Sequence, residues 1–532
     1  MKKGWRDMKI KKIISFFLAC CLIFCAGCSK QNENSNTNTE LTNNEKSNLS
    51  NFDILYCTRD TFDPYSCKTK QNFELSYLLF DPLVKLDNDY NLNYCLAKEV
   101  SLKDAVCTIT LKEAYFTDGT KVTVDDIVFS FNKAKNSSTI FAYSLKNAVS
   151  IQKADDKTAI IKLTKKDPYF MYVLDFPILK KDSDNLKNSD NKSLPPIGSG
   201  RYLFNEDYSA LIANNKYHGV ISNIKNIGLV DSPDTESDYH NIEIGLIDYY
   251  YSNLQNGEFP KMNGIKVDVN LNNLVFLGIN HNNKYLSNVH FRQALSSAID
   301  RNSIAEKSYY TNAKSAKGPF PTFFKPARDY QTITSSANNE VAITNLQKLG
   351  ITKKNQKGNY LYNEKEVSLK LLVNMDNSIR TQAAEKIAEQ LNSFGFTVQV
   401  EKVSRSVYDS RIKSKNYDLY LGEMRLSNNM DLTELISFIS STGYTANKSI
   451  VETSSTTSST PQEVRQEITT ANAVNKFYNG EYTLGDVLSV FNSELPIIPI
   501  VHRTGLCIYS NNIKYNFIPS NSDLFFGIEN IK

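Results

Sequence analysis

Hydrophobic residues in the second half of the chain follow a strand–helix–strand order. Residues 369–373 form a short apolar run that predicts a buried strand. Apolar residues then recur at helical spacing from Ile379 to Leu391, which indicates one buried helix face, and Gly395 follows as a helix stop. Apolar and polar residues alternate from 398 to 400, as in a second strand. Such a unit implies a right-handed crossover and a partly parallel sheet.

The same pattern of elements occurs elsewhere in the chain. Residues 107–111 and 417–421 each predict a strand. Thr123 precedes an apolar helical segment and predicts a capped helix start, and another amphipathic helix is predicted from about Asn288. Mixed strands and helices of this kind place the protein in the α/β class.

The N-terminal segment determines the expected compartment. Six Lys or Arg fall within the first 12 residues, and residues 13–27 are apolar or small. This run is shorter than the ~20 residues of a membrane-spanning helix and has the flanks of a signal peptide. The sequence Cys-Ala-Gly-Cys at 25–28 resembles the bacterial lipobox, with Cys25 where Leu is usual. We therefore predict a signal peptide at 1–27 and an acylated Cys28, the alternative being an ordinary cleavable signal.

Composition beyond the signal changes two expectations. Residues 28–50 contain almost no apolar side chains and predict a disordered tether. Removing the six basic residues and one Asp of residues 1–27 leaves 55 Lys and Arg against 56 Asp and Glu. The mature chain is therefore nearly neutral, which gives no reason to expect a nucleic-acid partner.

Cysteines and histidines indicate no metal or catalytic site. The cysteines beyond the anchor are Cys57, Cys67, Cys95, Cys107 and Cys507. Their odd number and irregular spacing argue against a disulfide framework and a zinc site, while a Cys57–Cys67 disulfide and a pair of buried thiols both remain possible. The histidines, interpreted as surface or capping residues, are His218, His240, His281, His290 and His502. No hydrolase, metalloprotease or phosphate-loop motif is present, so we predict a non-enzyme without cofactors.

Short segments along the mature chain resemble the solute-binding proteins of peptide and nickel ATP-binding-cassette importers, in the order of that family. They are Phe-Asp-Pro-Tyr at 62–65, Phe-Asp-Pro-Leu at 80–83, Leu-Ala-Lys-Glu-Val at 96–100, Phe-Thr-Asp-Gly at 116–119 with its capped helix, Pro-Ile-Gly-Ser-Gly at 196–200, Glu-Ile-Gly-Leu-Ile-Asp at 243–248, Phe-Arg-Gln-Ala-Leu at 291–295 and Pro-Ile-Ile-Pro at 496–499. Each segment alone is a weak signal, and their common order makes the resemblance strong.

The resemblance implies a two-lobed, periplasmic-binding-protein-like fold with an inserted subdomain and a hinge. The implied first lobe comprises 51–80, 195–273 and 495–532, the inserted subdomain 81–194, and the second lobe 274–494. The chain is expected to cross between the lobes near Asn273 and near Leu495, and ligand to be enclosed when the lobes close.

In the family, a second-lobe strand lines the cleft and bonds an extended peptide. Residues 417–428 match that strand, and alternation places Glu423, Arg425 and Ser427 on one face. The resemblance also marks two departures, because Met424 replaces the usual Trp and Ser427 replaces the acid that pairs with the peptide amine. By position, both are still expected to contact the ligand, together with Glu423 and Arg425.

The missing acid leaves the ligand anchor open. Glu423 or Asp431 is the expected substitute for the negative charge, and Arg425 is expected to bind a ligand carboxylate. The alternative is that Glu423 and Arg425 pair with each other or with neighbours. Tyrosines 249, 250 and 251 are further cleft candidates, with Tyr249 and Tyr250 preferred and one or two of the three expected to face ligand.

The expected function is a lipid-anchored, monomeric, extracytoplasmic binding protein that delivers a small peptide or peptide-like ligand to the permease subunits of an importer. Other possibilities are a nickel chelate or haem as the ligand, a non-transport sensor lipoprotein, and, remotely, an extracellular hydrolase. The sequence leaves open whether the anchor faces the outside of a single membrane or a periplasm.

Overall fold

The computed structural model describes residues 52–191, 193–255, 257–441, 469–513 and 518–531. The predicted signal peptide, Cys28 and the tether at 28–50 lie outside these ranges. Among the described residues, no helix is both long enough and apolar enough to cross a bilayer.

The first lobe is built on a four-stranded sheet in the order β1-β10-β9-β8, in which β1 and β10 are parallel. Its strands are β1 (Phe52–Tyr56), β8 (Tyr202–Phe204), β9 (Ala210–Ala213) and β10 (Asn226–Asp231). The helices of this lobe are α2 (Lys70–Leu79) and α5 (Thr235–Glu243), and the 3-10 turn Ile528–Asn530 closes the chain.

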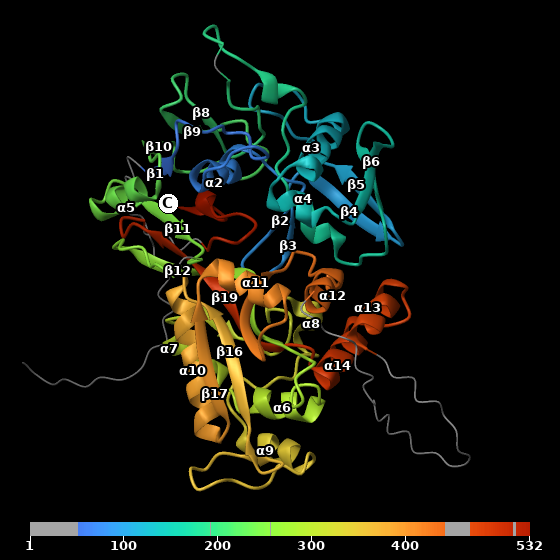
Figure 1. Ribbon diagram of the computed structural model, residues 1–532. Coiled ribbons are helices and arrows are strands. Elements are labelled where there is room, and N and C mark those ends of the chain that lie inside the picture. The colour runs from blue at the N-terminus through green and yellow to red at the C-terminus, as the bar shows by residue number, and fades with distance from the viewer. Residues whose placement is uncertain (1–51, 192, 256, 442–468, 514–517, 532) are drawn as a thin grey trace, which may run out of the picture. The chain divides into compact units, whose positions relative to one another are not determined.

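The segment predicted as an inserted subdomain forms an antiparallel sheet in the order β4-β5-β7-β6 (Figure 1). Its elements are β2 (Val84–Leu86), β3 (Leu92–Tyr94), β4 (Ala97–Lys103), β5 (Val106–Leu111), α3 (Val124–Asn136), α4 (Ile140–Ser144), β6 (Ala148–Lys153), β7 (Thr158–Leu163) and the 3-10 turns Phe170–Val173 and Ser183–Asn185. Thr123 and Asp126 form the capping box that begins α3. Buried residues of this sheet and of the first lobe belong to one continuous core, so the two pack as a single body.

The second lobe is a sheet covered by helices on both faces. Its elements are β12 (Ile265–Ile279), α6 (Val289–Ser297), α7 (Arg301–Lys307), β13 (Ala313–Ser315), α8 (Lys325–Arg328), α9 (Asn339–Gln347), β14 (Leu361–Tyr362), β15 (Lys365–Glu366), β16 (Ser368–Asn374), α10 (Ser378–Phe394), β17 (Thr397–Val403), α11 (Arg405–Lys413), β18 (Leu419–Arg425), α12 (Leu432–Ser441), α13 (Thr470–Tyr478), α14 (Leu484–Glu494) and β19 (Ile498–Tyr509). The strand β11 (Tyr249–Ser252) pairs with β19 and so extends this sheet, but its side chains pack in the first lobe. The main strand order is β11-β19-β12-β18-β16-β17, with β13 beside β19.

Two hydrophobic cores lie on opposite faces of this sheet. Leu371, Leu419 and Leu421 point into the core that contains α6, α7, α9 and α10. Leu372 and Tyr420 point into the core that contains α8, α12, α13 and α14. Burial on both faces explains why these strands are continuously apolar, and each fully buried Leu stabilises the fold by about 2 kcal/mol.

The crossover predicted from sequence is present in this lobe. β16 and β17 are parallel neighbours joined by α10. The predicted apolar positions of α10, from Ile379 to Leu391, are buried. The helix is capped by Gly395, whose backbone N–H donates to the carbonyls of Leu391 and Asn392; its left-handed conformation (φ 119°) favours glycine.

Strands β12 and β19 run from one lobe into the other. Val269 and Leu271 of β12 lie in the first-lobe core, and Val275 lies in a second-lobe core, which places this crossing beside Asn273. On β19 the change of core falls between Val501 and Cys507 rather than at Leu495, because Leu495 packs in the second lobe. The hinge is therefore a pair of hydrogen-bonded strands with an irregular register between Asn270 and Leu274.

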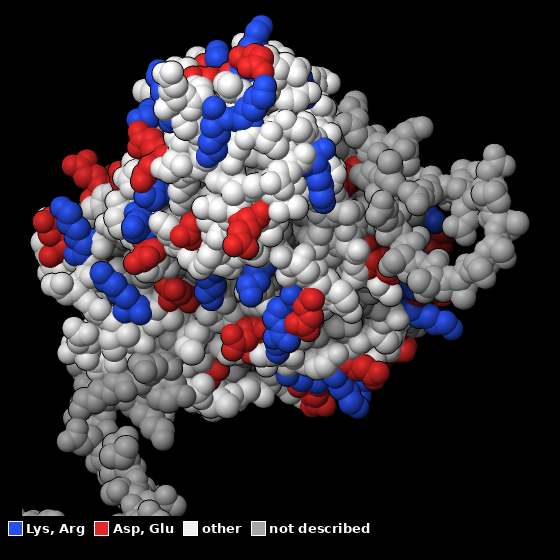
Figure 2. Space-filling model, turned by 90° about the horizontal axis from the view of Figure 1, so that it is seen from below, with Lys and Arg blue, Asp and Glu red and all other residues white. Residues whose placement is uncertain are grey.

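Positive and negative side chains are interspersed on the face of the molecule in Figure 2, without a region of one sign. This distribution agrees with the nearly neutral composition of the chain beyond the predicted signal.

Candidate functional site

A cleft with a volume of about 890 Å³ lies between the first lobe with its subdomain and the second lobe. The first-lobe wall comes from the start of α2, from α4 and from the end of β11, and the second-lobe wall from β18 and the residues that follow it. The apolar and aromatic lining residues include Phe73, Tyr77, Ile140, Phe141, Tyr251, Leu271, Leu426 and Leu524. This volume lies at the upper end of the range for small-molecule pockets.

The predicted face of β18 does line the cleft. Glu423, Arg425 and Ser427 all belong to the lining, whereas Met424 points away into the second-lobe core and is 8% exposed. The register on the neighbouring strand places Arg425 opposite Asn273 of β12. The alternation inferred from sequence places Glu423, Arg425 and Ser427 on one face, as the structure does. The prediction of Met424 as a ligand contact is corrected, because the same alternation turns its side chain into the core.

Glu423 is held by two arginines from other elements. Its carboxylate accepts hydrogen bonds from Arg380 at 2.6 Å, Arg503 at 2.7 Å and the Asn273 amide at 2.7 Å. Burial opposes ionisation, but the two guanidinium groups prevail and lower the pKa of Glu423. Glu423 is therefore a fixed, ionised counter-charge, and its carboxylate is already engaged within the cleft wall.

Arg425 presents the contrasting environment. Its side chain is exposed, and its guanidinium has no hydrogen-bond or ion-pair partner among the described residues. The charge of Arg425 acts on groups of the first lobe. Burial raises the pKa of Tyr77, Tyr251 and Asp175, and Arg425 partly offsets this rise. An unpaired guanidinium facing these groups across the cleft can bind a carboxylate in two-point geometry.

Asp431, the other expected amine anchor, does not line the cleft. It accepts hydrogen bonds from Lys165 at 3.1 Å and from the Tyr478 hydroxyl at 2.5 Å, and these partners lower its pKa despite burial. Ser427 donates to Asn429 at 2.6 Å and is buried. Glu423 and Asp431, the two residues expected to bind the ligand amine, are thus both engaged by contacts within the protein.

Two carboxylates on the first-lobe side are better placed for a ligand cation. Burial raises the pKa of Glu74 to about 7, partly offset by Lys70 at 3.3 Å. Burial also raises the pKa of Asp175 to about 6, although Asn428 donates to it at 2.7 Å. A ligand ammonium beside either carboxylate favours the ionised form of that carboxylate, so the binding of the ammonium and the loss of the carboxyl proton are linked.

The structure separates the three predicted tyrosines. Tyr251 lines the cleft, whereas the Tyr249 hydroxyl donates to the Leu524 carbonyl at 2.6 Å inside the first-lobe core. Tyr250 faces a smaller neighbouring cavity of about 290 Å³. Alternation along β11 explains why Tyr250 differs from Tyr251, and neither preferred tyrosine reaches the cleft.

Sequence reasoning missed several lining residues because they come from distant elements. Arg380 lies in the first turn of α10, Arg503 on β19, and Asp175 after a 3-10 turn. Glu74 and Tyr77 lie on α2. The sequence pattern that could have indicated one of them is the apolar face of α10. That face determines the side of the helix on which Arg380 lies, once the sheet order is known.

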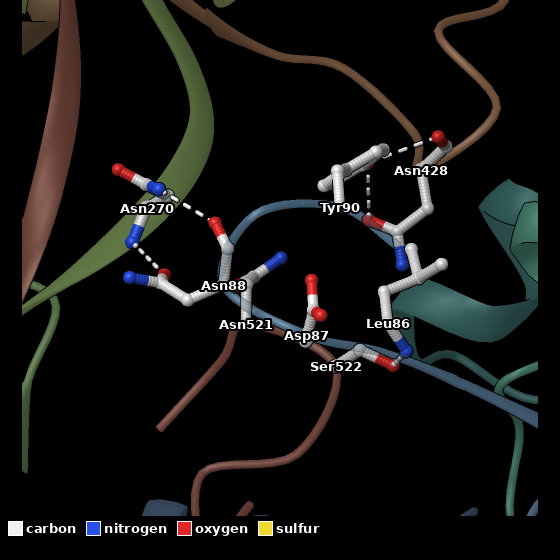
Figure 3. Close-up of a pocket in the computed structure, with 8 residues that line it drawn as sticks. All are labelled: Leu86, Asp87, Asn88, Tyr90, Asn270, Asn428, Asn521 and Ser522. Atoms are coloured by element: carbon white, nitrogen blue, oxygen red, sulfur yellow. Dashed lines mark hydrogen bonds between the residues drawn. The ribbon is translucent and has the colours of Figure 1, made fainter. Parts of the chain in front are cut away.

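Beside the cleft, the subdomain contacts the second lobe through its β2–β3 hairpin. Figure 3 shows the Tyr90 hydroxyl donating to the Asn428 carbonyl at 2.9 Å, while the Asn88 side chain accepts from the Asn270 backbone at 2.9 Å. These groups enclose a cavity of about 10 Å³, which is the space of one water molecule. The hairpin thereby touches both the hinge strand β12 and the segment after β18.

The remaining cysteines of the described chain are free thiols, so the Cys57–Cys67 disulfide is not formed. Cys57 is buried, and Cys67 is partly exposed at the cleft. Burial and neighbouring carboxylates raise the pKa of Cys67 to about 12, which makes it a poor nucleophile at neutral pH.

Two lobes joined by paired crossing strands, with a large cleft at the junction, define a solute-binding protein of the periplasmic-binding-protein type. Residues 91–446 match the family described as bacterial extracellular solute-binding proteins, family 5. The chain belongs to this family.

Curated relatives of the chain are named as binding proteins. The oligopeptide-binding protein AppA of Bacillus subtilis is 26% identical over 395 residues, covering 69% of each chain. The heme-binding protein A of Haemophilus influenzae is 24% identical over 367 residues, covering 59% of this chain and 64% of its own.

Solved structures share the fold at lower identity. A nickel ABC transporter protein of Bacillus halodurans has a TM-score of 0.67 at 15% identity, covering 89% of this chain and 98% of that one. A peptide-binding protein AppA of Clostridium difficile has a TM-score of 0.63 at 18% identity, covering 90% and 99%.

Proposed function

We propose that the protein is the solute-binding component of an ATP-binding-cassette importer and captures a carboxylate-bearing peptide or peptide-like solute in the cleft. The unpaired Arg425, facing first-lobe residues across a space of about 890 Å³, carries this proposal. The relatives named for oligopeptide binding support the peptide class. The permease subunits are the expected partners of the loaded protein, which acts as a monomer.

The charge of the lining favours an anionic group on the ligand. Six basic side chains face three acidic ones: Lys68, Lys70, Arg380, Arg405, Arg425 and Arg503 against Glu74, Asp175 and Glu423. Glu423 is shared by two of the arginines, and Glu74 and Asp175 have raised pKa values. The ligand carboxylate therefore supplies the missing negative charge. Binding then depends less on the ligand amine than it would if a second-lobe acid anchored that amine.

The edge of β18 supports the capture of an extended chain. β12 pairs with β18 from Leu419 to Arg425, but β16 pairs only with Leu419 and Tyr420. The opposite edge beyond Leu421 has no strand beside it among the described residues. A peptide can add there as a strand, with its carboxylate at Arg425 and its amine toward Asp175 or Glu74.

A metal chelate with several carboxylates is the second candidate ligand. The excess of arginine in the lining fits an anionic chelate as well as a peptide, and the fold is shared with a protein named as a nickel ABC transporter. In both cases the protein closes around the ligand only because the ligand binds the closed state more tightly.

Mass spectrometry of the ligand retained through purification distinguishes these candidates. A peptide with a free carboxyl group supports the main proposal, and a chelated metal supports the second. A retained neutral or cationic solute contradicts both. A copurifying permease supports the transport role, whereas signalling without a permease supports a sensor. Turnover of a panel of peptides and esters contradicts the binding role and supports a hydrolase.

The proposed membrane attachment is tested separately at Cys28. An acylated Cys28 keeps the protein in the membrane fraction, since each buried acyl methylene contributes about 0.8 kcal/mol. Cys28→Ala is expected to release the protein into the medium or the periplasm. Retention of the variant in the membrane fraction contradicts the anchor.

A further inference from the structure

Three side chains that commonly bind metals meet inside the first lobe, outside the cleft lining. Asp81 follows the end of α2, Cys95 follows β3, and His218 lies in the loop after β9. One ligand atom from each lies within 4.8 Å of the others. The positions are far apart in sequence, so cysteine spacing gave no sign of them, and His218 is nine-tenths buried rather than a surface residue.

The cluster contains polar atoms that nothing in the described protein satisfies. The Oδ1 atom of Asp81 is engaged by Lys85 at 3.0 Å and by the Tyr217 hydroxyl at 3.2 Å. Among the described residues, neither its Oδ2 atom, which lies 3.5 Å from His218 Nε2, nor the buried Nδ1 atom of His218 makes a hydrogen bond. A buried polar atom left unpaired costs about 1–3 kcal/mol, so two such atoms in one cluster call for an explanation.

We propose that Asp81 Oδ2, the Cys95 thiolate and one ring nitrogen of His218 bind a divalent transition-metal ion of the zinc type, with water completing the coordination. Carboxylate, thiolate and imidazole are the ligands of zinc in proteins. Bond lengths of about 2.0–2.3 Å place the ligand atoms of a tetrahedral ion about 3.3–3.6 Å apart. Asp81 Oδ2 already lies 3.5 Å from His218 Nε2.

The surroundings of the cluster suit the ligand roles. A ligating carboxylate is normally held by hydrogen bonds on its other oxygen, which Lys85 and Tyr217 provide for Asp81. Cys95 binds as the thiolate, and its proton passes to solvent when the ion enters.

Other charges around the site set its affinity. Lys85, Lys112 and Arg201 place positive charge nearby, and Asp523 lies 3.4 Å from Lys85. The incoming ion meets Asp81 and the new thiolate on one side and the Lys85 ammonium on the other. This balance favours a site of moderate affinity that joins three separate segments of the first lobe.

The ion is expected to act structurally and independently of the solute cleft. It joins the end of α2, the β2–β3 hairpin and the loop after β9. A ligand that binds only the folded state stabilises that state by mass action. Zinc is therefore expected to raise the melting temperature without changing solute affinity.

Cobalt and zinc titrations of the purified protein test the site. One equivalent of Co²⁺ is expected to give a thiolate-to-cobalt absorption band, and Zn²⁺ to displace it. Cys95→Ser is expected to abolish the band, and both Cys95→Ser and His218→Asn to weaken Zn²⁺ binding by at least about tenfold. Cys67→Ser is the matched control, because this more accessible thiol lies at the cleft and is expected to leave both readouts unchanged.

Measurements without metal keep the test independent of folding. Circular dichroism and melting of each variant in chelator show whether it folds, and the metal-dependent rise in melting temperature is then compared with that of the wild type. No bound cobalt or zinc in the wild type contradicts the site. Binding that survives both Cys95→Ser and His218→Asn, or that is lost in Cys67→Ser, assigns the metal elsewhere and also contradicts it.

Discussion

The two halves of the segment from Glu423 to Glu434 have opposite environments. In the first half, Glu423 is fixed by two arginines, while the neighbouring Arg425 faces the cleft and has no partner in the part of the chain that the structure describes. In the second half, polar side chains are saturated by the subdomain of the first lobe. Those contacts are Asn428 with Asp175 at 2.7 Å, Asn429 with Asp167 at 2.7 Å, Asp431 with Lys165 at 3.1 Å and Glu434 with Lys146 at 2.7 Å.

Under the proposed function, this difference separates ligand capture from contact between the lobes. The first half retains an unsatisfied charge, so binding energy is available there for a solute. The second half has used its polar groups to hold the lobes together. Asp175 connects the halves, because it lines the cleft and also accepts a hydrogen bond from Asn428. A solute that reaches both Arg425 and Asp175 therefore contacts both lobes at once, as closure around a ligand requires.

The largest expected effect is on stability, at Glu423. Glu423→Gln leaves Arg380 and Arg503, both largely buried, without their counter-charge. Breaking a buried ion pair in this way costs about 3 kcal/mol of unfolding free energy. Denaturant unfolding at pH 7 measures the loss.

The pH dependence of the same variant gives a second check. The folded-state pKa of Glu423 is lowered, so its stabilisation is present above the unfolded value of 4.5 and is lost as pH falls through the folded value. The unfolding free energy of Glu423→Gln is therefore expected to fall less with decreasing pH than that of the wild type. Glu364→Gln is the control, because its pair with Lys353 is exposed and contributes about 0.5 kcal/mol. Equal losses in the two variants at pH 7 mean that the Glu423 pairs are not structural.

The next effect is on binding, at Arg425. Arg425→Ala is expected to lower solute affinity at least about tenfold, which corresponds to about 1.4 kcal/mol, because the ligand carboxylate loses its two-point partner. The melting temperature is expected to stay unchanged, since the guanidinium has no partner among the described residues. Isothermal titration with the retained solute measures the affinity.

Arg405 provides a matched control for that experiment. It also lines the cleft, but it pairs with Asp409 at 2.7 Å on its own helix. Arg405→Ala is expected to change solute affinity by less than Arg425→Ala does. Unchanged binding in Arg425→Ala rejects this residue as the carboxylate anchor.

Local patterns in the sequence were sufficient for the elements and for one wall of the cleft. The four-residue spacing from Ile379 to Leu391 predicted α10, and the two-residue spacing of β18 separated Glu423 and Arg425 from Met424. Both periods follow from backbone geometry and need no knowledge of distant residues.

Partners from distant elements could not be predicted in the same way. Nothing near Glu423 in the sequence indicates Arg380 or Arg503, which approach it only after the sheet order is set. Asp431 looked available for a ligand amine because Lys165 and Tyr478 are far away along the chain. The sequence predicts the second crossing near Leu495, but the crossing lies further along β19 for a similar reason. Pairing with the distant strand β12 continues the second lobe beyond Leu495.

A smaller effect is expected where the second half contacts the subdomain. Asp431→Asn removes the charge from the pair with Lys165 and is expected to cost about 1 kcal/mol of unfolding free energy, because Lys165 remains partly hydrated. A double-mutant cycle with Lys165→Met isolates the pair. A coupling energy near zero shows that this contact does not hold the lobes together. Solute affinity is expected to change less than in Arg425→Ala.

The smallest effect concerns Asp175, where the two halves meet. Its folded pKa, raised to about 6 from 3.8 by burial, means that the folded state holds this proton more tightly than the unfolded state does. Stability from this group therefore rises as pH falls from 7.5 toward 5, and the gain is complete below the unfolded pKa. We expect about 1 kcal/mol rather than the full value of the shift, because the side chain is partly exposed. Denaturant unfolding of wild type and Asp175→Asn at pH 7.5 and 5 isolates the group, since the other acids contribute equally to both proteins. A gain confined to the wild type supports the raised pKa of Asp175, whereas the same gain in both proteins rejects Asp175 as the titrating group between the cleft and the lobe contact.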